Sequence, residues 1–318
     1  MSLSPFFSVC IETKNRYSTI ERTLISVLHQ DCRDFELILV DNNSSDSTIN
    51  VINKFFNSEE FKKKPFNYLI KSSSVSKLEN WNKPIEFASG KYIAYLEGDD
   101  SYLENHLSHA KKTLMDDPSI GLYFAQSYGK KKTNLGGILH LNKCNFLVEL
   151  LEEAPAPSSI IFKRVISNKV MLFNVKDYKY APEVDLYLKI SSFDYKIFYS
   201  DNVSIKRDIE KIPKSSKSDL KFHDRNIIIN KWGKYFKCKK INDLRKKNYN
   251  MFFYTCINEY SNNEKNWKKL WRRLSVYLKE FNYLTYLKFL TLKYILQFLI
   301  SIGLFNFIKI IRSKLKIK

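Results

Sequence analysis

The first hundred residues alternate between short apolar runs and segments with helical spacing, and this alternation limits the possible folds more than any other feature. Four apolar runs have strand character, at residues 7–13, 35–41, 66–70 and 92–96. Between them, apolar residues recur every three or four positions, which indicates amphipathic helices. The run at 35–41 is almost continuously apolar, as is typical of a strand buried on both faces of a parallel sheet. The pattern predicts a doubly wound α/β sheet.

The expected helices and the missing glycine motifs refine this prediction. We expect helices at 20–30, 49–56, 78–88 and 103–114, and a further strand at 120–125. No Gly-x-Gly-x-x-Gly follows the first strand, and no Gly-x-x-x-x-Gly-Lys occurs. The sequence therefore indicates neither the dinucleotide mode nor the P-loop mode of phosphate binding.

The strongest functional signal is a strand that runs straight into carboxylates. Residues 90–96 have the composition of a buried strand, and Glu97, Asp99 and Asp100 follow within four positions. Ligands bind at the carboxyl ends of strands in such sheets, and adjacent aspartates repel each other unless a cation or a hydrogen-bonded sugar shares the site. A divalent cation held between the protein and a diphosphate would bind at this strand end and would relieve the repulsion between the two aspartates. The alternative is an Asp-rich turn that caps the next helix.

Other polar residues end the neighbouring strands. Asp41 ends the second strand as Asp99 ends the fourth, while Thr13 and Asn15 end the first. Parallel strands bring these ends to one edge of the sheet. An Asp at this edge can accept hydrogen bonds from a base N–H or a ribose hydroxyl, although Asp41 alone is equally typical of a turn.

The ordered blocks 8–16, 26–30, 35–46, 79–82 and 90–100 resemble the nucleotide-sugar-binding half of the GT-A glycosyltransferases, specifically glycosyltransferase family 2. The similarity covers residues 6–105 and continues more weakly to about 205. It implies a Rossmann-like, mixed but mostly parallel sheet flanked by helices. Glu12 stands where the family usually has Pro, Lys14 where it commonly has Tyr, and Glu97 where it often has Asp.

The resemblance assigns roles to individual residues. Thr13 and Asp41 are expected to contact the nucleobase, and Asp99 and Asp100 the ribose and the Mn²⁺ or Mg²⁺ ion that bridges the diphosphate. The full set implied for nucleotide-sugar binding is Thr13, Asn15, Arg16, Asp41, Asn80, Asn82 and Asp99. The two asparagines flank Trp81, for which a place in the core is the alternative.

A second acidic pair, Glu183 and Asp185, opens a helical apolar pattern. In the family, an acidic pair at the start of this helix supplies the catalytic base. A sugar hydroxyl must lose its proton as it attacks the anomeric carbon, and a carboxylate can accept that proton. Glu183 is the first choice for the base and Asp185 the second; the alternative for both is a carboxylate favoured by the helix dipole. One base and one metal imply a single displacement with inversion.

The net charge of +20 lies entirely in the last third of the chain. Residues 1–210 hold 27 basic and 27 acidic residues, whereas 211–318 hold 26 and 6. We therefore expect a catalytic domain at 1–210 and a basic, aromatic-rich helical extension at 211–318. The uncharged stretch at 294–308 is shorter than the ~20 residues of a transmembrane helix. It is suited to an anionic membrane surface or to packing on the sheet; nucleic-acid binding is not expected, because no known motif is present.

The cysteines, the histidines and the N-terminal residues give expectations about disulfides, metal ligands and a signal peptide. The five cysteines are far apart, which argues against zinc ribbons and disulfide scaffolds and fits a reducing compartment. His106 and His109 are three residues apart, and we expect them on the surface of a helix rather than as metal ligands. Residues 1–12 lack the basic and apolar regions of a secretory signal peptide.

These observations predict an inverting glycosyltransferase that moves a sugar from a nucleotide-diphosphate-sugar donor to a glycan or lipid-linked glycan acceptor. We expect it to act in bacterial surface polysaccharide synthesis, at the cytoplasmic face of the cell membrane. One alternative is a sugar nucleotidyltransferase, which would carry a Gly-rich first loop with Arg and Lys, unlike residues 13–16. The other is a non-enzymatic membrane or nucleic-acid binder, which needs only the C-terminal third.

Overall fold

The computed structural model describes residues 4–251 apart from 77–78, 129–136, 139–141, 168–171, 175, 179–180, 194, 209–217, 240 and 249–250. The chain forms two compact units. The first contains residues 1–212 and His223–Leu244, and the second Pro213–Phe222 and Arg245–Lys318. The stretches at 283–318 and 294–308 lie outside the described residues.

The first unit is built on a mixed sheet with the order β3-β2-β1-β4-β8-β6-β9-β5, in which β7 also pairs with β9. Its strands are β1 (Phe7–Thr13), β2 (Phe35–Asp41), β3 (Asn67–Ser72), β4 (Tyr92–Glu97), β5 (Ser101–Tyr102), β6 (Ile120–Ser127), β7 (Gly137–Ile138), β8 (Ile160–Lys163) and β9 (Lys196–Lys206). The half formed by β3, β2, β1 and β4 is entirely parallel. β8 is antiparallel to both β4 and β6. The α/β prediction is confirmed.

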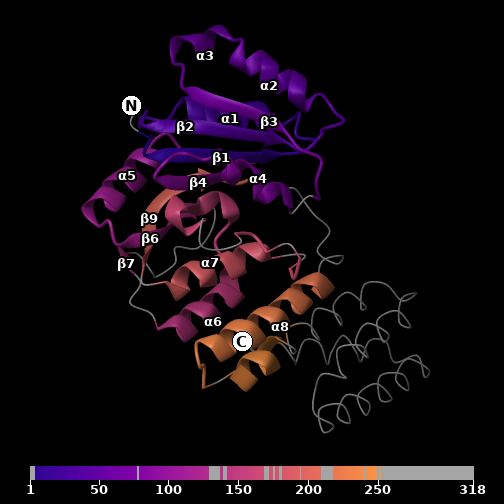
Figure 1. Cartoon of the computed structure of the whole chain (residues 1–318), viewed down its shortest axis with the longest axis vertical. Helices are drawn as coiled ribbons and strands as arrows, with labels where there is room; N and C mark the ends of the chain where they lie inside the picture. Colours follow the sequence, from indigo (N-terminus) through magenta and orange to yellow (C-terminus); the bar gives the residue numbers. More distant parts are fainter. Residues whose placement is uncertain are drawn as a thin grey trace, which may run out of the picture. The chain divides into compact units, whose positions relative to one another are not determined.

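The helices cover both faces of this sheet (Figure 1). They are α1 (Ile20–Leu28), α2 (Thr48–Phe56), α3 (Glu59–Lys63), α4 (Lys83–Glu86), α5 (His106–Asp116), α6 (Lys143–Glu153), α7 (Pro182–Ser192) and α8 (Ser218–Tyr235). Short 3₁₀ turns lie at η1 (Glu79–Trp81), η2 (Pro157–Ser159) and η3 (Arg164–Ile166).

Successive residues of β1 belong to different cores, as the strand period of two requires. Val9 and Ile11 pack with α1, α2 and α5 on one face, whereas Cys10 packs with α4, α6, α7 and α8 on the other. All three side chains are fully buried. This explains why the strand is apolar at nearly every position.

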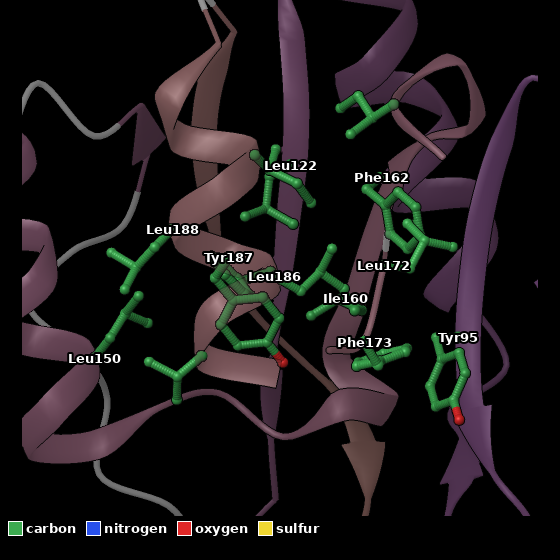
Figure 2. Close-up of a cluster of buried hydrophobic side chains, with 14 of the residues drawn as sticks. Tyr95, Leu122, Leu150, Ile160, Phe162, Leu172, Phe173, Leu186, Tyr187 and Leu188 are labelled. Atoms are coloured by element: carbon green, nitrogen blue, oxygen red, sulfur yellow. The ribbon is translucent and has the colours of Figure 1, made fainter. Parts of the chain in front are cut away.

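The second core joins α7 to the sheet. In Figure 2, Tyr187 of α7 lies in the same cluster as Ile160 of β8 and Phe173. Phe173 packs edge-on against Trp81 at 5.1 Å between ring centroids. Since buried side chains of this size each contribute about 1.5–3 kcal/mol to folding, the cluster fixes the start of α7 relative to the sheet.

Two expectations from the sequence were wrong in detail. Residues 79–88 do not form one regular helix but the turn η1 followed by α4, with Pro84 in the first turn of α4. His106 is fully buried rather than exposed, and its Nδ1 lies 2.9 Å from Ser204 Oγ. The spacing of α5 already indicated this burial, because His106 lies four residues before Ala110 and eight before Leu114, which are also buried.

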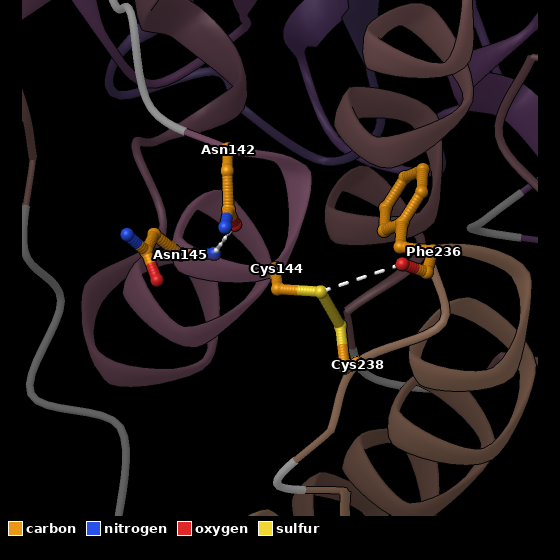
Figure 3. The surroundings of a disulfide bond; sticks show 5 residues. All are labelled: Asn142, Cys144, Asn145, Phe236 and Cys238. Carbon is orange, nitrogen blue, oxygen red and sulfur yellow. Dashed lines mark hydrogen bonds between the residues drawn. A yellow bond between two sulfur atoms is a disulfide. The ribbon is translucent and has the colours of Figure 1, made fainter.

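Cys144 and Cys238 form a disulfide, contrary to the expectation that the cysteines are reduced (Figure 3). Cys144 lies in the first turn of α6, and Cys238 follows α8. The two residues are 94 positions apart, so no local spacing indicates the pairing. They meet because α6, α7 and α8 pack together in the first unit.

The compact unit also extends beyond residue 210. Residues 223–235 of α8 pack into the core of the first unit through Ile228 and Trp232, both of which are buried. No helix in the described part of the chain is long and apolar enough to cross a membrane.

Candidate active site

The polar strand ends converge at one edge of the sheet because β1, β2 and β4 are parallel. In the registers of the ladders, Thr13 of β1 pairs with Asp41 of β2, and Glu12 of β1 pairs with Glu97 of β4. Asp99 and Asp100 follow immediately after β4. The arrangement that the sequence predicts for these strand ends is therefore present.

Gly98 lets the loop after β4 lie directly against the end of β1. Its backbone N–H donates to the carbonyl of Glu12 at 3.1 Å. A Cβ at this position would lie 3.0 Å from Thr13 Oγ1, so a side chain would displace Thr13. The Thr13 hydroxyl is buried and has no hydrogen-bond partner among the described residues. It is thus a polar group held at the edge of the site without a protein partner.

The loops after β1 and β2 are tied together by hydrogen bonds. Asn15, with φ of 52°, donates its N–H to Ser44 Oγ at 2.8 Å and accepts from Ser45 N at 2.9 Å. Ser44 in turn donates to Asp41 from its hydroxyl at 2.5 Å and from its N–H at 2.9 Å. These bonds link Asn15, in the loop after β1, to Asp41 at the end of β2 through Ser44. The side chain of Asn15 is thus engaged by the protein itself.

Arginines surround the two aspartates after β4. Arg16 Nη2 lies 2.8 Å from Asp99 Oδ2, and Arg22 donates to the Asp99 carbonyl at 3.0 Å. Arg22 also binds the Asp208 carboxylate at 2.7 Å. Arg16 and Asp99, predicted separately as ligand-binding residues, are thus in direct contact.

Asp100 is the most buried carboxylate of this group. Its Oδ1 accepts from the N–H of Asp208 at 3.0 Å. Its Oδ2 has no hydrogen bond among the described residues, and Arg207 Nε lies 3.8 Å from it. Burial raises the pKa of Asp100, while Ser158 and Arg207 oppose the shift. The sequence assigned none of Ser158, Arg207 and Asp208 to the surroundings of Asp100, because all three are far from Asp100 along the chain.

The site concentrates negative charge. Burial, followed by the charges of Asp100, Glu12 and Asp99, raises the pKa of Glu97 well above its ordinary value. An orphaned buried oxygen on Asp100 within such a cluster fits a hard divalent cation. No group of three or more His, Cys, Asp or Glu in the described residues could hold a metal ion. Asp100, with Asp99 beside it, would hold such an ion, and Mg²⁺ commonly binds proteins through only one or two carboxylates.

Asn80 and Asn82 are engaged by the protein. Asn80 is buried; its Nδ2 donates to Glu12 Oε2 at 3.2 Å, and its Oδ1 accepts from Ser73 at 2.8 Å. Asn82 exchanges two hydrogen bonds of 2.9 Å with the backbone of Phe173. Both side-chain amides therefore form hydrogen bonds within the protein. Their contact with a nucleotide stays a prediction.

Glu183 and Asp185 have opposite surroundings, although they are two residues apart on α7. Asp185 is fully buried, with Lys189 Nζ at 2.9 Å, Lys231 Nζ at 2.8 Å and Trp232 Nε1 at 2.7 Å. Burial alone would raise the pKa of Asp185, but hydrogen bonds from the two lysines outweigh it, and the pKa is lowered. Asp185 is held as an anion that links α7 to α8.

Glu183 is less enclosed than Asp185. It is half-buried at the start of α7, where Pro182 occupies the first turn. The charges of Glu183 and Glu97 both raise the pKa of the Tyr187 hydroxyl, after the larger effect of burial. The Tyr187 hydroxyl donates to the Pro155 carbonyl at 3.2 Å, and the Glu97 N–H donates to Ser158 Oγ at 3.0 Å. Helix α7 and the end of β4 therefore both contact the segment 155–159.

The sequence profile described as Glycosyl transferase family 2 matches residues 8–169, about half of the chain and the whole region from β1 to β8. The chain belongs to glycosyl transferase family 2. The resemblance inferred from the ordered blocks is thereby confirmed.

Two relatives match this chain over different lengths. The uncharacterized protein MT1568 of Mycobacterium tuberculosis is 27% identical over 230 residues, which cover 64% of this chain and 67% of that protein. The GalNAc(5)-diNAcBac-PP-undecaprenol beta-1,3-glucosyltransferase of Campylobacter jejuni is 32% identical over 125 residues, 39% of this chain and 38% of that protein. The chain thus matches less than two fifths of the Campylobacter enzyme.

Solved structures show the same fold. S. aureus TarS 1-349 aligns with a TM-score of 0.58 at 16% identity, covering 84% of this chain and 78% of TarS 1-349. The mannosyltransferase PcManGT of Pyrobaculum calidifontis, solved with GDP-Man and Mn²⁺, aligns with a TM-score of 0.54 at 16% identity, covering 87% and 86%. The family 2 chain therefore has the GT-A fold.

Proposed function

We propose that this family 2 protein transfers a sugar, with inversion, from a nucleotide-diphosphate-sugar to a glycan or lipid-linked glycan acceptor in bacterial surface polysaccharide synthesis. One observation supports the proposal: Thr13, Asp41 and the carboxylates that follow β4 converge at one edge of the sheet, where the buried Oδ2 of Asp100 has no hydrogen-bond partner among the described residues. The Campylobacter relative is named for an undecaprenol-linked substrate, and a TarS structure with a TM-score of 0.55 contains UDP-GlcNAc. Both support this substrate class.

In the proposed mechanism, each residue of the site binds a different part of the donor. Thr13 and Asp41 bind the nucleobase side of the donor, and Asp99 and Asp100 hold the divalent cation. That cation, when bound, neutralises the diphosphate as it leaves. Arg16 orients Asp99 through their ion pair.

Glu183 is the proposed base. It accepts the proton of the acceptor hydroxyl as that oxygen attacks the anomeric carbon. The attack comes from the face opposite the departing diphosphate, so the configuration at that carbon inverts. Asp185 is less suited to the role, because its carboxylate is enclosed by two lysines and a tryptophan. Asp185 instead positions the start of α7.

The test measures thermal stabilisation of the full chain by a panel of nucleoside diphosphates with Mn²⁺. We expect one nucleotide to raise the melting temperature, and the Asp100→Ala variant to lose this response. Asp116→Ala, which removes an exposed carboxylate at the end of α5, serves as the matched control and keeps the response. If no nucleotide stabilises the wild-type chain, the proposed donor site is wrong.

A further inference from the structure

One face of α1 holds the loop that carries the two aspartates after β4. Three side chains of the helix and its N-cap donate, in chain order, to the three backbone carbonyls of residues 98–100. The donors are Thr19 at 3.1 Å, Arg22 at 3.0 Å and Thr23 at 2.8 Å. Residues three and four positions apart lie on the same face of a helix. The backbone of the aspartate loop is therefore fixed to α1 at three consecutive positions.

Arg22 makes a second contact, which reaches the segment after β9. The Nη2 atom that donates to the Asp99 carbonyl also lies 2.7 Å from Asp208 Oδ2. The backbone N–H of Asp208 in turn donates to Oδ1 of Asp100 at 3.0 Å. Arg22 thus connects the backbone of Asp99 to the residue that binds the carboxylate of Asp100.

This connection bears on which oxygen of Asp100 a cation can reach. Oδ1 is engaged by the N–H of Asp208, whereas the buried Oδ2 has no hydrogen bond among the described residues. A cation bound by Asp100 would therefore meet Oδ2. Hydrogen bonds from outer-shell residues orient the ligands of a metal ion, and their removal typically lowers metal affinity by about 10–100-fold.

The ion pair between Arg22 and Asp208 is poorly suited to stabilising the fold. The two side chains are 47% and 34% exposed, and exposed ion pairs contribute little to stability. The pair nevertheless joins residues 186 positions apart, at the point where both ends adjoin the aspartates. Its effect on the geometry of the site is therefore larger than its effect on folding.

We propose that Arg22 is a positioning residue, which acts through Asp208 to keep Oδ2 of Asp100 turned toward the cation of the donor site. Arg22 does not bind the cation or the donor in this role. The inference rests on the proposed function, since the cation belongs to that donor site.

The charge of Arg22 and its positioning role predict opposite results for the Arg22→Gln variant. The substitution removes a positive charge close to the carboxylates, and this loss alone would strengthen the binding of a cation. A misplaced Asp100 would weaken it. The sign of the change in affinity therefore separates the two effects.

Isothermal titration calorimetry on the full chain measures binding of ADP, CDP, GDP, UDP and dTDP, once with Mn²⁺ and once with EDTA. In the wild type we expect Mn²⁺ to strengthen the binding of one nucleotide. Arg22→Gln should weaken binding with Mn²⁺ by about 10–100-fold and leave binding in EDTA unchanged. Lys196→Gln is the matched control, because it breaks an ion pair with Asp117 of similar exposure, at the opposite end of β9. This control should bind like the wild type.

A second variant tests whether Arg22 acts through Asp208. Asp208→Asn keeps the backbone N–H that binds Asp100 but removes the charged partner of Arg22, and it should also weaken binding with Mn²⁺. If the two residues act as one unit, the double variant should bind no more weakly than the weaker single variant. Melting temperatures, which should stay close to that of the wild type, check that each variant folds.

The possible outcomes distinguish this inference from the proposed function. The role of Arg22 is overturned if Arg22→Gln binds with Mn²⁺ as tightly as the wild type or more tightly. It is also overturned if binding in EDTA weakens by the same factor, or if the effects of the two substitutions add. Normal binding by the wild type in these cases leaves the donor site intact. A wild-type chain that binds no nucleotide with Mn²⁺ contradicts the proposed function and this inference together.

Discussion

Glu183 and Asp185 show how the surroundings of a residue decide its role. Both carboxylates lie in the first turn of α7 and are chemically alike. Asp185 is fully buried and neutralised by Lys189 and Lys231, whereas Glu183 is only half-buried. Only the three-dimensional contacts distinguish a residue that holds helices together from one that can take a proton.

The different surroundings of Glu183 and Asp185 give a first prediction. Glu183→Gln should lower the transfer rate by about 10²–10⁴-fold, the usual contribution of a general base, while the affinity for the nucleotide-sugar stays unchanged. Asp185→Asn should instead lower the free energy of unfolding, by about 3–5 kcal/mol, because the two lysines lose their buried partner. Transfer rates, donor binding and urea unfolding of both variants check this. An active Glu183→Gln protein together with a stable but inactive Asp185→Asn protein would reverse the assignment.

His106 gives a prediction about pH. Burial lowers its pKa from 6.5 to about 3. Between these values the unfolded chain binds a proton that the folded chain does not, so stability is complete above about pH 6.5 and falls as the pH drops toward 3. The loss approaches about 1.4 kcal/mol per pH unit.

The measurement is urea unfolding at several values between pH 7 and pH 4.5. His106→Gln should show a flatter dependence than the wild type, whatever its stability at pH 7. His29→Gln alters an exposed histidine that pairs with Glu60, and it should keep the wild-type slope. An unchanged slope in His106→Gln would mean that the histidine is not buried as a neutral group.

At the scale of elements, α6, α7 and α8 form one packed group held by different kinds of contact. Asp185 joins α7 to α8 through Lys231, and the disulfide joins α6 to the turn after α8. Figure 1 shows the three helices side by side. Because Glu183 belongs to α7, the stability of this group bears on the geometry of the proposed base.

The disulfide gives a prediction at this scale. A double variant, Cys144→Ser/Cys238→Ser, should lose about 2–4 kcal/mol of unfolding free energy, since the bond closes a long loop in the unfolded chain. Dithiothreitol should lower the wild type to the same value and leave the double variant unchanged. Cys32→Ser, which alters a free cysteine, is the control. Peptide mapping that finds Cys144 and Cys238 both alkylated without reduction would contradict the pairing.

The elements also show what the sequence can and cannot predict. Strands β1, β2 and β4 were predictable because their apolar runs are continuous and polar residues mark their ends. The break between η1 and α4 and the burial of His106 had local signals, in Pro84 and in the four-residue spacing from His106 to Ala110. Their distant partners Phe173 and Ser204 were not predictable. The same holds for the approach of Arg207 to Asp100, because the two residues lie more than a hundred positions apart.

At the scale of the whole molecule, the uneven distribution of charge along the chain leads to a prediction about membrane binding. Residues 1–210 are neutral overall, and the surplus of 20 positive charges follows them. Part of this basic stretch, residues 223–244, belongs to the first compact unit. Any role in membrane binding therefore falls mainly on the residues after 244, among them the apolar and basic segment 283–318.

Deletion of residues 283–318 tests that role. We expect the full chain to sediment with phosphatidylserine vesicles at low salt and to be released as salt rises, because the attraction is between basic side chains and anionic headgroups. The truncated chain should remain in the supernatant yet keep its nucleotide response, since the proposed donor site lies in the first unit. Phosphatidylcholine vesicles give the background. Equal sedimentation of both chains would contradict a membrane role for this segment, and binding of the full chain to RNA but not to vesicles would favour the nucleic-acid alternative.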